Sequence, residues 1–287
     1  MKILFVVPHY FDPRGGASHQ SLSGNPQPRV EALAACLRSL HHLFGSEQSA
    51  LDIARRLTVP ANAEFRHAID VVLCTVGERH VLARLPFSAN VYQQHACRCE
   101  PKLLGFECQQ VLRDALDRYD YYCYLEDDLV IHDPLFFTKL AWFTREAGSE
   151  CLLQPNRYET PDQAVGRKLY VDGDLRSRVH RRLLDQRSLP ELRRQVLGAE
   201  IVFRGALNPH AGCFCLSAAQ MRHWAAQPWF GDRDTSFIGP LESAATLGIL
   251  RTFHIYKPAL EHAAFLEIQH YGEGYLGYAG GGLPFAQ

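Results

Sequence analysis

Three consecutive carboxylates, Glu126, Asp127 and Asp128, are the side chains in this sequence best suited to chemistry. They lie between an apolar run at 121–125 and another at 129–131, which is not the usual setting of a solvated surface segment. Adjacent carboxylates repel one another and lose solvation when partly buried, and a divalent cation would relieve both costs. Oxygen ligands suit Mg²⁺ or Mn²⁺, which keep waters and accept substrate phosphates. The alternative is a turn with solvated acids.

The position of the triplet also favours a ligand site. In α/β sheets, ligands gather at the carboxyl ends of strands, and the triplet directly follows an expected strand. In an extended chain, Glu126 and Asp128 point to one side and Asp127 to the other. One carboxylate could therefore hold a metal while another holds a sugar hydroxyl.

Strands and helices alternate along the chain, which predicts an α/β fold with a mainly parallel sheet flanked by helices. We expect a single domain over residues 1–270 and a Gly-rich flexible tail over 271–287. The Arg-rich polar segment 172–195 predicts a helical excursion on the surface. Expected strands cover 2–7, 69–75, 121–125, 151–154, 211–216 and 249–256, and expected helices cover 28–44, 103–119, 135–145 and 218–226.

Composition excludes some classes of partner. The 287 residues include 30 basic and 31 acidic side chains, so no overall field favours nucleic acid or an anionic membrane. No apolar run reaches the roughly 18 residues of a membrane-spanning helix, and the run at 3–7 is too short for a signal peptide. These features predict a cytoplasmic protein, with peripheral attachment at the inner membrane surface left open. The nine cysteines are expected to be reduced core thiols, and the alternative is a zinc site at His95, Cys97, Cys99 and Cys108.

The triplet and its context resemble the GT-A (Rossmann-like) glycosyltransferases, in which a D-x-D motif follows a central strand. This sequence departs from the motif by having Glu126 at the first position. Residues 208–217 resemble the glycine strand on the acceptor side of these enzymes, and 237–243 resemble the region that carries the base of inverting members. Residues 261–270 resemble the late segment that supplies a histidine to the metal. The chain also resembles a set of bacterial proteins with the motifs YLEDDL and GPLESAATLG.

The resemblance implies a hexosyltransferase-like enzyme that uses Mn²⁺ or Mg²⁺. It would move a sugar from a nucleotide-diphosphate donor to a hydroxyl of a glycan or lipid-linked acceptor. Glu242 would take the acceptor proton in an inverting reaction, with Asp232 and Asp234 as alternative bases. The implied metal ligands are Asp128, Glu126 and His270, with His262 as second choice for the histidine.

Further residues are candidates for donor and acceptor contacts. For Arg29 and Lys257 the alternative is ordinary surface charge. The donor candidates are Pro8, His9, Tyr10, Arg29, Asp127 and Lys257, and the acceptor candidates are Asn156, Arg157, Asn208 and His210.

Three other functions stay open. A GT-B glycosyltransferase would fit the opening at 8–16, although two Rossmann domains usually need a longer chain. A metal-dependent phosphoesterase would use the same acids, but two-metal sites want several acid clusters. A non-enzymatic module would bind a cation or sugar without turnover.

Overall fold

A five-stranded sheet forms the centre of the molecule, in the strand order β13-β6-β1-β4-β5. Strands β1 (Lys2–Pro8), β4 (Ala68–Val76), β5 (Gln93–Cys97) and β6 (Tyr121–Leu125) run parallel, and β13 (Cys213–Ser217) pairs antiparallel with β6 at the edge. β6 is buried along its whole length, as its unbroken apolar sequence predicts. The computed structural model describes residues 1–15, 20–161, 166–175 and 183–278. The expected α/β fold, a single domain with a mainly parallel sheet, is confirmed.

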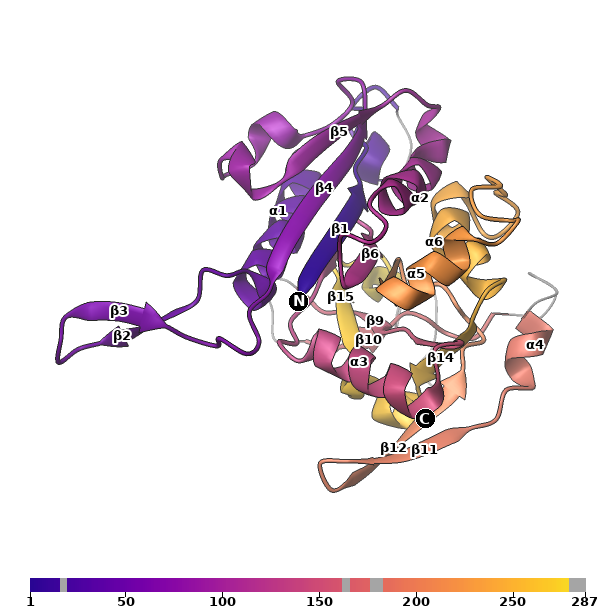
Figure 1. Cartoon of the computed structure of the whole chain (residues 1–287). Helices are drawn as coiled ribbons and strands as arrows, with labels where there is room; N and C mark the ends of the chain where they lie inside the picture. Colours follow the sequence, from indigo (N-terminus) through magenta and orange to yellow (C-terminus); the bar gives the residue numbers. More distant parts are fainter. Residues whose placement is uncertain (16–19, 162–165, 176–182, 279–287) are drawn as a thin grey trace.

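Helices cover both faces of this sheet (Figure 1). Alternate residues of β1 pack on one side against α1 (Gln27–Phe44) and α3 (Phe136–Ala147). The residues between them pack on the other side against α2 (Leu104–Asp114), α5 (Ala218–Ala225) and α6 (Pro240–Leu250). A capping box of Ser217 and Gln220 starts α5.

Two smaller sheets lie outside the central sheet. One has the order β10-β9-β15-β7 and contains β7 (Leu129–Val130), β9 (Asn156–Glu159), β10 (Leu169–Tyr170) and β15 (Glu267–His270). The other has the order β11-β12-β14-β8 and contains β8 (Cys151–Leu153), β11 (Leu192–Val196), β12 (Ala199–Gly205) and β14 (His254–Pro258). β7 follows the triplet and pairs with β15. His270, the last residue of β15, therefore lies beside the triplet.

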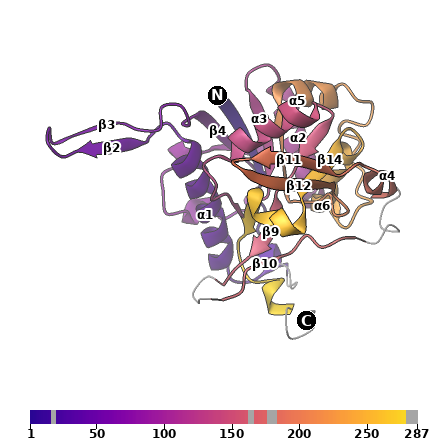
Figure 2. The same cartoon turned by 90° about the horizontal axis from the view of Figure 1, so that it is seen from below.

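A two-stranded hairpin projects from the body (Figures 1 and 2). It consists of β2 (Ser49–Asp52) and β3 (Leu57–Pro60), and Leu51 and Ile53 are exposed on it. The remaining short elements are α4 (Leu183–Arg187), η1 (Gln20–Leu22), η2 (Leu82–Arg84), η3 (Ala89–Val91), η4 (Pro101–Leu103), η6 (Leu260–Phe265) and η7 (Leu276–Tyr278).

Three sequence expectations about elements were wrong. The strand expected at 249–256 is the end of α6, which runs to Leu250, followed by β14 from His254. The helix expected at 103–119 ends at Asp114, and Asp117 has a left-handed φ of 64°. The segment 172–195 is not one helix, because it contains the short α4 and most of β11; residues 176–182 lie outside the described residues.

The chain after β15 lies against the site. The Tyr271 N–H donates to the Asp128 carbonyl at 2.7 Å, and the Leu276 N–H donates to a Glu159 carboxylate oxygen at 2.6 Å. Residues 279–287 of the expected flexible tail lie outside the described residues. None of the described helices combines the length and the apolar character needed to cross a membrane.

Candidate active site

A cavity of about 570 Å³ opens where β1 and β6 end, at the carboxyl ends of the parallel strands. The sequence predicted several of its lining residues separately, from four distant segments, and the fold brings them together. The lining consists of Pro8, Tyr10, Ser21, Leu22, Arg29, Pro101, Lys102, Leu104, Glu126, Asp127, Asp128, Gly239, Pro240, Leu241 and Glu242.

Asp127 is held from two sides by buried partners. Arg29, from the first turn of α1, donates to Asp127 and also to Asp128 Oδ2 at 3.1 Å. His9 is fully buried, and its Nε2 accepts the Val81 N–H at 3.1 Å, so its proton sits on Nδ1 and is donated to Asp127. Burial alone would raise the pKa of Asp127, but Arg29 and His9 lower it to about 2. Asp127 is therefore ionised and held in place. His9, which the sequence predicted to contact the nucleotide, is fully buried and contacts Asp127 instead.

Glu126 and Asp128 keep oxygen atoms that no described residue satisfies. Glu126 Oε1 and Asp128 Oδ1 are buried and have no hydrogen-bond partner. Burial and then the charge of Asp128 raise the pKa of Glu126 to about 8, although Arg157 Nη1 lies 4.0 Å from Glu126 Oε2. Gly212 allows this packing: its φ is 63°, and an added Cβ would lie 2.7 Å from the Glu126 carboxylate. The glycine predicted in this strand thus makes room for the acid.

His270 is oriented toward the triplet, as the sequence predicted. A ring hydrogen bond of 2.8 Å joins its Nδ1 to Glu159, and its Nε2 lies 3.8 Å from Asp128 Oδ2. Burial alone would lower the pKa of His270, but Asp128 and Glu159 raise it above the usual value. His262, the second choice, instead accepts the Val202 N–H at 3.3 Å, on β12.

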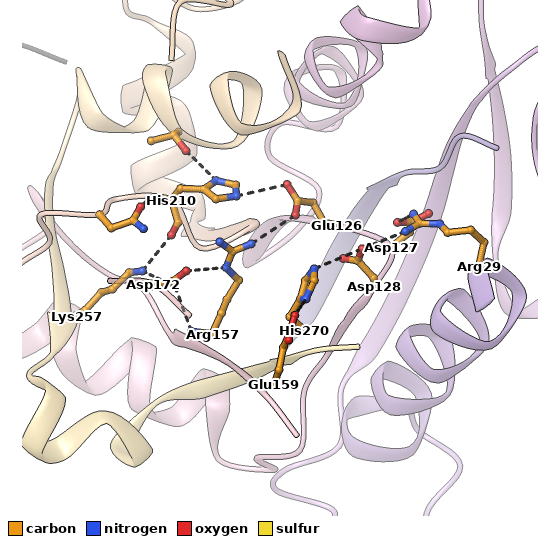
Figure 3. A network of polar contacts seen from close by, with 12 residues as sticks. Arg29, Glu126, Asp127, Asp128, Arg157, Glu159, Asp172, His210, Lys257 and His270 are labelled. Carbon is orange, nitrogen blue, oxygen red and sulfur yellow. Dashed lines mark hydrogen bonds and ion pairs between the residues drawn. The ribbon is translucent and has the colours of Figure 1, made fainter. Parts of the chain in front are cut away.

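A buried chain of polar contacts leads away from Glu126 (Figure 3). Arg157 Nε donates to Asp172 Oδ1 at 2.8 Å, and Lys257 Nζ donates to Asp172 Oδ2 at 2.7 Å. Lys257 Nζ also donates to the His210 carbonyl at 3.1 Å. The His210 ring lies 3.8 Å from Glu126 and contacts Thr246 of α6 at 3.2 Å. Arg29 and Lys257 are thus buried, and neither is the surface charge that the sequence left open.

Several predicted residues lie outside the first cavity. Asn156, Asn208 and Lys257 line a second cavity of about 460 Å³. Asp232 and Asp234, the alternative bases, both pair with Arg251. Asp172, which joins Arg157 to Lys257, gave no sequence signal because it sits in a polar, Arg-rich segment.

The capacity of the site for a metal depends on the two free carboxylate oxygens. No group of three or more His, Cys, Asp or Glu side chains within the described ranges is arranged to hold a metal by itself. Mg²⁺ and Mn²⁺ do not need such a group, since one or two carboxylates, waters and substrate phosphates suffice for them. Asp128 and Glu126 fit that requirement. The alternative zinc site at His95, Cys97, Cys99 and Cys108 is not formed, and all nine cysteines are free.

The raised pKa of Glu126 predicts a pH effect on stability. Without metal, we expect Glu126 to contribute a fall in the free energy of unfolding as the pH rises from near 4.5 to about 8, because folded Glu126 holds its proton through this range and the unfolded chain does not. Glu126→Gln, which cannot ionise, should lack this contribution, so its stability should fall less, or rise more, with pH than that of the wild type. Urea unfolding in EDTA at several pH values measures this. Equal slopes for the wild type, Glu126→Gln and the exposed control Glu47→Gln would contradict it.

Comparisons with known proteins give a similarity of fold only. No family model matches the chain, and no curated protein matches it. It is similar to S. aureus TarS 1–349 in complex with UDP, with a TM-score of 0.46 and 11% identity over 95% of this chain and 61% of that one. The complex of TarS 1–349 with UDP-GlcNAc gives 0.41 and 12%, over 95% and 59%. The chain thus spans less than two thirds of that protein's fragment, and at this level of similarity the function has to be inferred from the site.

Proposed function

We propose that the protein is a metal-dependent glycosyltransferase of the GT-A kind, which transfers a sugar from a nucleotide-diphosphate donor to a hydroxyl of a glycan or lipid-linked acceptor. One observation carries the proposal. Glu126 and Asp128, each of which keeps a buried oxygen without a hydrogen-bond partner, line the same cavity as Glu242, at the carboxyl edge of a parallel sheet. A cation-binding group and a general base therefore share one space of nucleotide size.

The charges of this cavity favour a cation together with the donor. Its lining contains four acidic residues, Glu126, Asp127, Asp128 and Glu242, of which Glu126 holds its proton below its pKa of about 8, and two cations, Arg29 and Lys102. Such a lining repels a diphosphate by itself, and a divalent cation bound at Asp128 and Glu126 reverses this. His270, held by Glu159 beside Asp128, is the further candidate ligand. When bound, Mn²⁺ or Mg²⁺ would stabilise the charge on the departing nucleoside diphosphate.

Glu242 is suited to accept the acceptor proton. It lies in the first turn of α6 and lines the same cavity as the acidic triplet. A Cβ at Gly239 would lie 2.5 Å from a Glu242 oxygen, so the glycine leaves the carboxylate room beside the cavity. As the acceptor oxygen attacks the donor sugar, its proton passes to Glu242 and the nucleoside diphosphate leaves from the opposite face. Because attack and departure take place on opposite faces of the sugar carbon, its configuration is inverted.

The remaining lining suits the nucleoside. Tyr10, Leu22, Leu104 and Leu241 add apolar surface to the lining, and the Tyr10 ring can stack on a base. Two alternatives fit less well. GT-B enzymes need two doubly wound domains, and the described residues contain one mainly parallel sheet. A two-metal phosphoesterase needs carboxylates for two ions, and this cavity is lined by only one run of adjacent acids, Glu126 to Asp128, together with Glu242.

Calorimetric titration of UDP, GDP, ADP and CDP with Mn²⁺, Mg²⁺ or EDTA tests the proposal. We expect one diphosphate to bind in a metal-dependent manner, and Asp128→Asn to weaken that binding at least tenfold, since a metal ligand is lost. In EDTA the two proteins should differ little. Asp114→Asn, an exposed carboxylate on α2, serves as the control. Binding that ignores both EDTA and Asp128 would remove the metal from the proposal, and absence of all nucleotide binding would reject it.

A further inference from the structure

The second cavity has a lining unlike that of the first. It measures about 460 Å³ and lies between β9, β10, the end of β12 and β14. It is lined by Asn156, Tyr170, Asp172, Gly173, Asp174, Arg204, Gly205, Ala206, Leu207, Asn208, Lys257, Pro258, Ala259 and Leu260.

Its charges balance, which argues against a phosphate or a cation as ligand. Two acids, Asp172 and Asp174, face two bases, Arg204 and Lys257. Asp172 and Lys257 neutralise each other in a buried pair at 2.7 Å. Arg204 is engaged by Glu261 at 2.6 Å. A neutral ligand can enter this cavity without leaving a buried charge unpaired.

The uncharged polar groups of this cavity are held in fixed orientations by hydrogen bonds. Asn156 Nδ2 donates to the Pro258 carbonyl at 2.9 Å, which orients the amide, and no described residue donates to its amide oxygen. Asn208 is held at both ends of its amide, since Nδ2 donates to the Gly173 carbonyl at 3.1 Å and Oδ1 accepts the His210 N–H at 3.3 Å. The Tyr170 hydroxyl donates to Glu267 at 2.6 Å, which fixes its ring. Amides beside a fixed aromatic ring and apolar side chains suit a ligand with hydroxyl groups and a C–H face, which is a sugar ring.

A chain of buried polar side chains runs between the second cavity and the first and separates them. Lys257 and Asp172 line the second cavity, Glu126 lines the first, and Arg157 contacts both acids between them (Figure 3). Arg157 and His210, expected to contact the acceptor, are both buried in this dividing wall. Contacts with a bound ligand therefore fall to Asn156, Asn208 and Tyr170 on its far side.

We propose that the second cavity is a carbohydrate site, which holds the part of a glycan acceptor beyond the reacting hydroxyl. The acceptor assignment rests on the proposed function, whereas the chemistry of the ligand follows from the cavity itself. This assignment requires a neutral, extended acceptor whose reactive end passes the wall of Arg157 and His210 to reach the first cavity, which is the proposed donor cavity.

Gly173→Trp is the decisive variant. Gly173 lines the cavity, and an added Cβ meets nothing within 4 Å, so a large side chain can fill the space with no clash at its root. Gly277→Trp, in η7, also meets nothing within 4 Å and is the matched control outside both cavities. Asn156→Ala removes one predicted hydrogen-bonding group.

The probes are glucose, galactose, mannose and N-acetylglucosamine, observed by saturation-transfer NMR, with UDP–Mn²⁺ titrations of the same proteins. We expect signal from at least one sugar, lost at least tenfold in Gly173→Trp, reduced in Asn156→Ala and kept in Gly277→Trp, with equal nucleotide binding throughout. No signal from any sugar, or an unchanged signal in Gly173→Trp, would overturn the carbohydrate site. Sugar binding blocked by Gly173→Trp in a protein that binds no nucleoside diphosphate would uphold the site and reject the proposed glycosyltransferase function.

Discussion

Glu242→Gln is expected to lower turnover by about 10²- to 10⁴-fold, the usual contribution of a general base, while nucleotide binding stays close to that of the wild type. The amide keeps the size of the carboxylate but cannot take the proton of the acceptor hydroxyl. The measurement is the rate at which nucleoside diphosphate is released from a nucleotide sugar in the presence of acceptor. Calorimetry with the nucleoside diphosphate and Mn²⁺ reports binding separately.

Asp234→Asn is the matched control for this loss. Asp234 is a carboxylate near the start of the same helix, but it is paired with Arg251 and does not line the donor cavity. Its substitution should leave turnover within a few-fold of the wild type. If Glu242→Gln turned over at the wild-type rate, Glu242 would not be the base, and a fall in Asp234→Asn would move that function to Asp234.

The second large effect is expected from Arg29→Met, which should cost about 3–5 kcal/mol of unfolding free energy in EDTA. Arg29 is 6% exposed and satisfies two carboxylates of the triplet. Its removal leaves buried negative charges, and His9 is then the one close partner that Asp127 keeps among the described residues. Urea unfolding at neutral pH measures the loss. Mn²⁺ should restore part of the stability, because a cation at Asp128 and Glu126 reduces the same repulsion.

Arg222→Met is the control for Arg29→Met, since Arg222 pairs with Asp117 at 2.8 Å on the surface. Exposed pairs of this kind contribute about 0–1 kcal/mol. A loss in Arg29→Met no larger than in Arg222→Met would show that the triplet does not depend on Arg29 for its charge balance.

Much of the central sheet could be predicted because its strands are buried on both faces. β1 and β6 have unbroken apolar sequences, and α1 has a clear apolar stripe. The end of α6 was predicted as a strand. This helix carries apolar residues on all of its faces, so Ile249 and Leu250 show no helical periodicity in the sequence. A short apolar run of this kind fits a buried helix and a buried strand equally well.

The site was only half predictable for a related reason. The triplet, Glu242 and His270 stand out by residue type and by their neighbours along the chain. The pairings that set their charges do not: Arg29, predicted as a donor contact, pairs with Asp127 98 residues away, and Asp172 pairs with Arg157 15 residues away. Such pairings depend on how the sheet brings segments together, and single-sequence patterns carry no record of them. Tyr170, whose ring lines the second cavity, was missed for the same reason.

The projecting hairpin of β2 and β3 offers a convenient handle for experiments. It lies between the last residue of α1, Phe44, and the first residue of β4, Ala68, which pairs with Lys2 at the amino end of β1. The donor cavity opens at the opposite, carboxyl ends of these strands. A biotinylated peptide inserted at the hairpin tip, near residues 53–56, would therefore attach the protein to a sensor chip by the side that carries the amino ends of these strands. Their carboxyl ends and the cavity would then face the ligand solution.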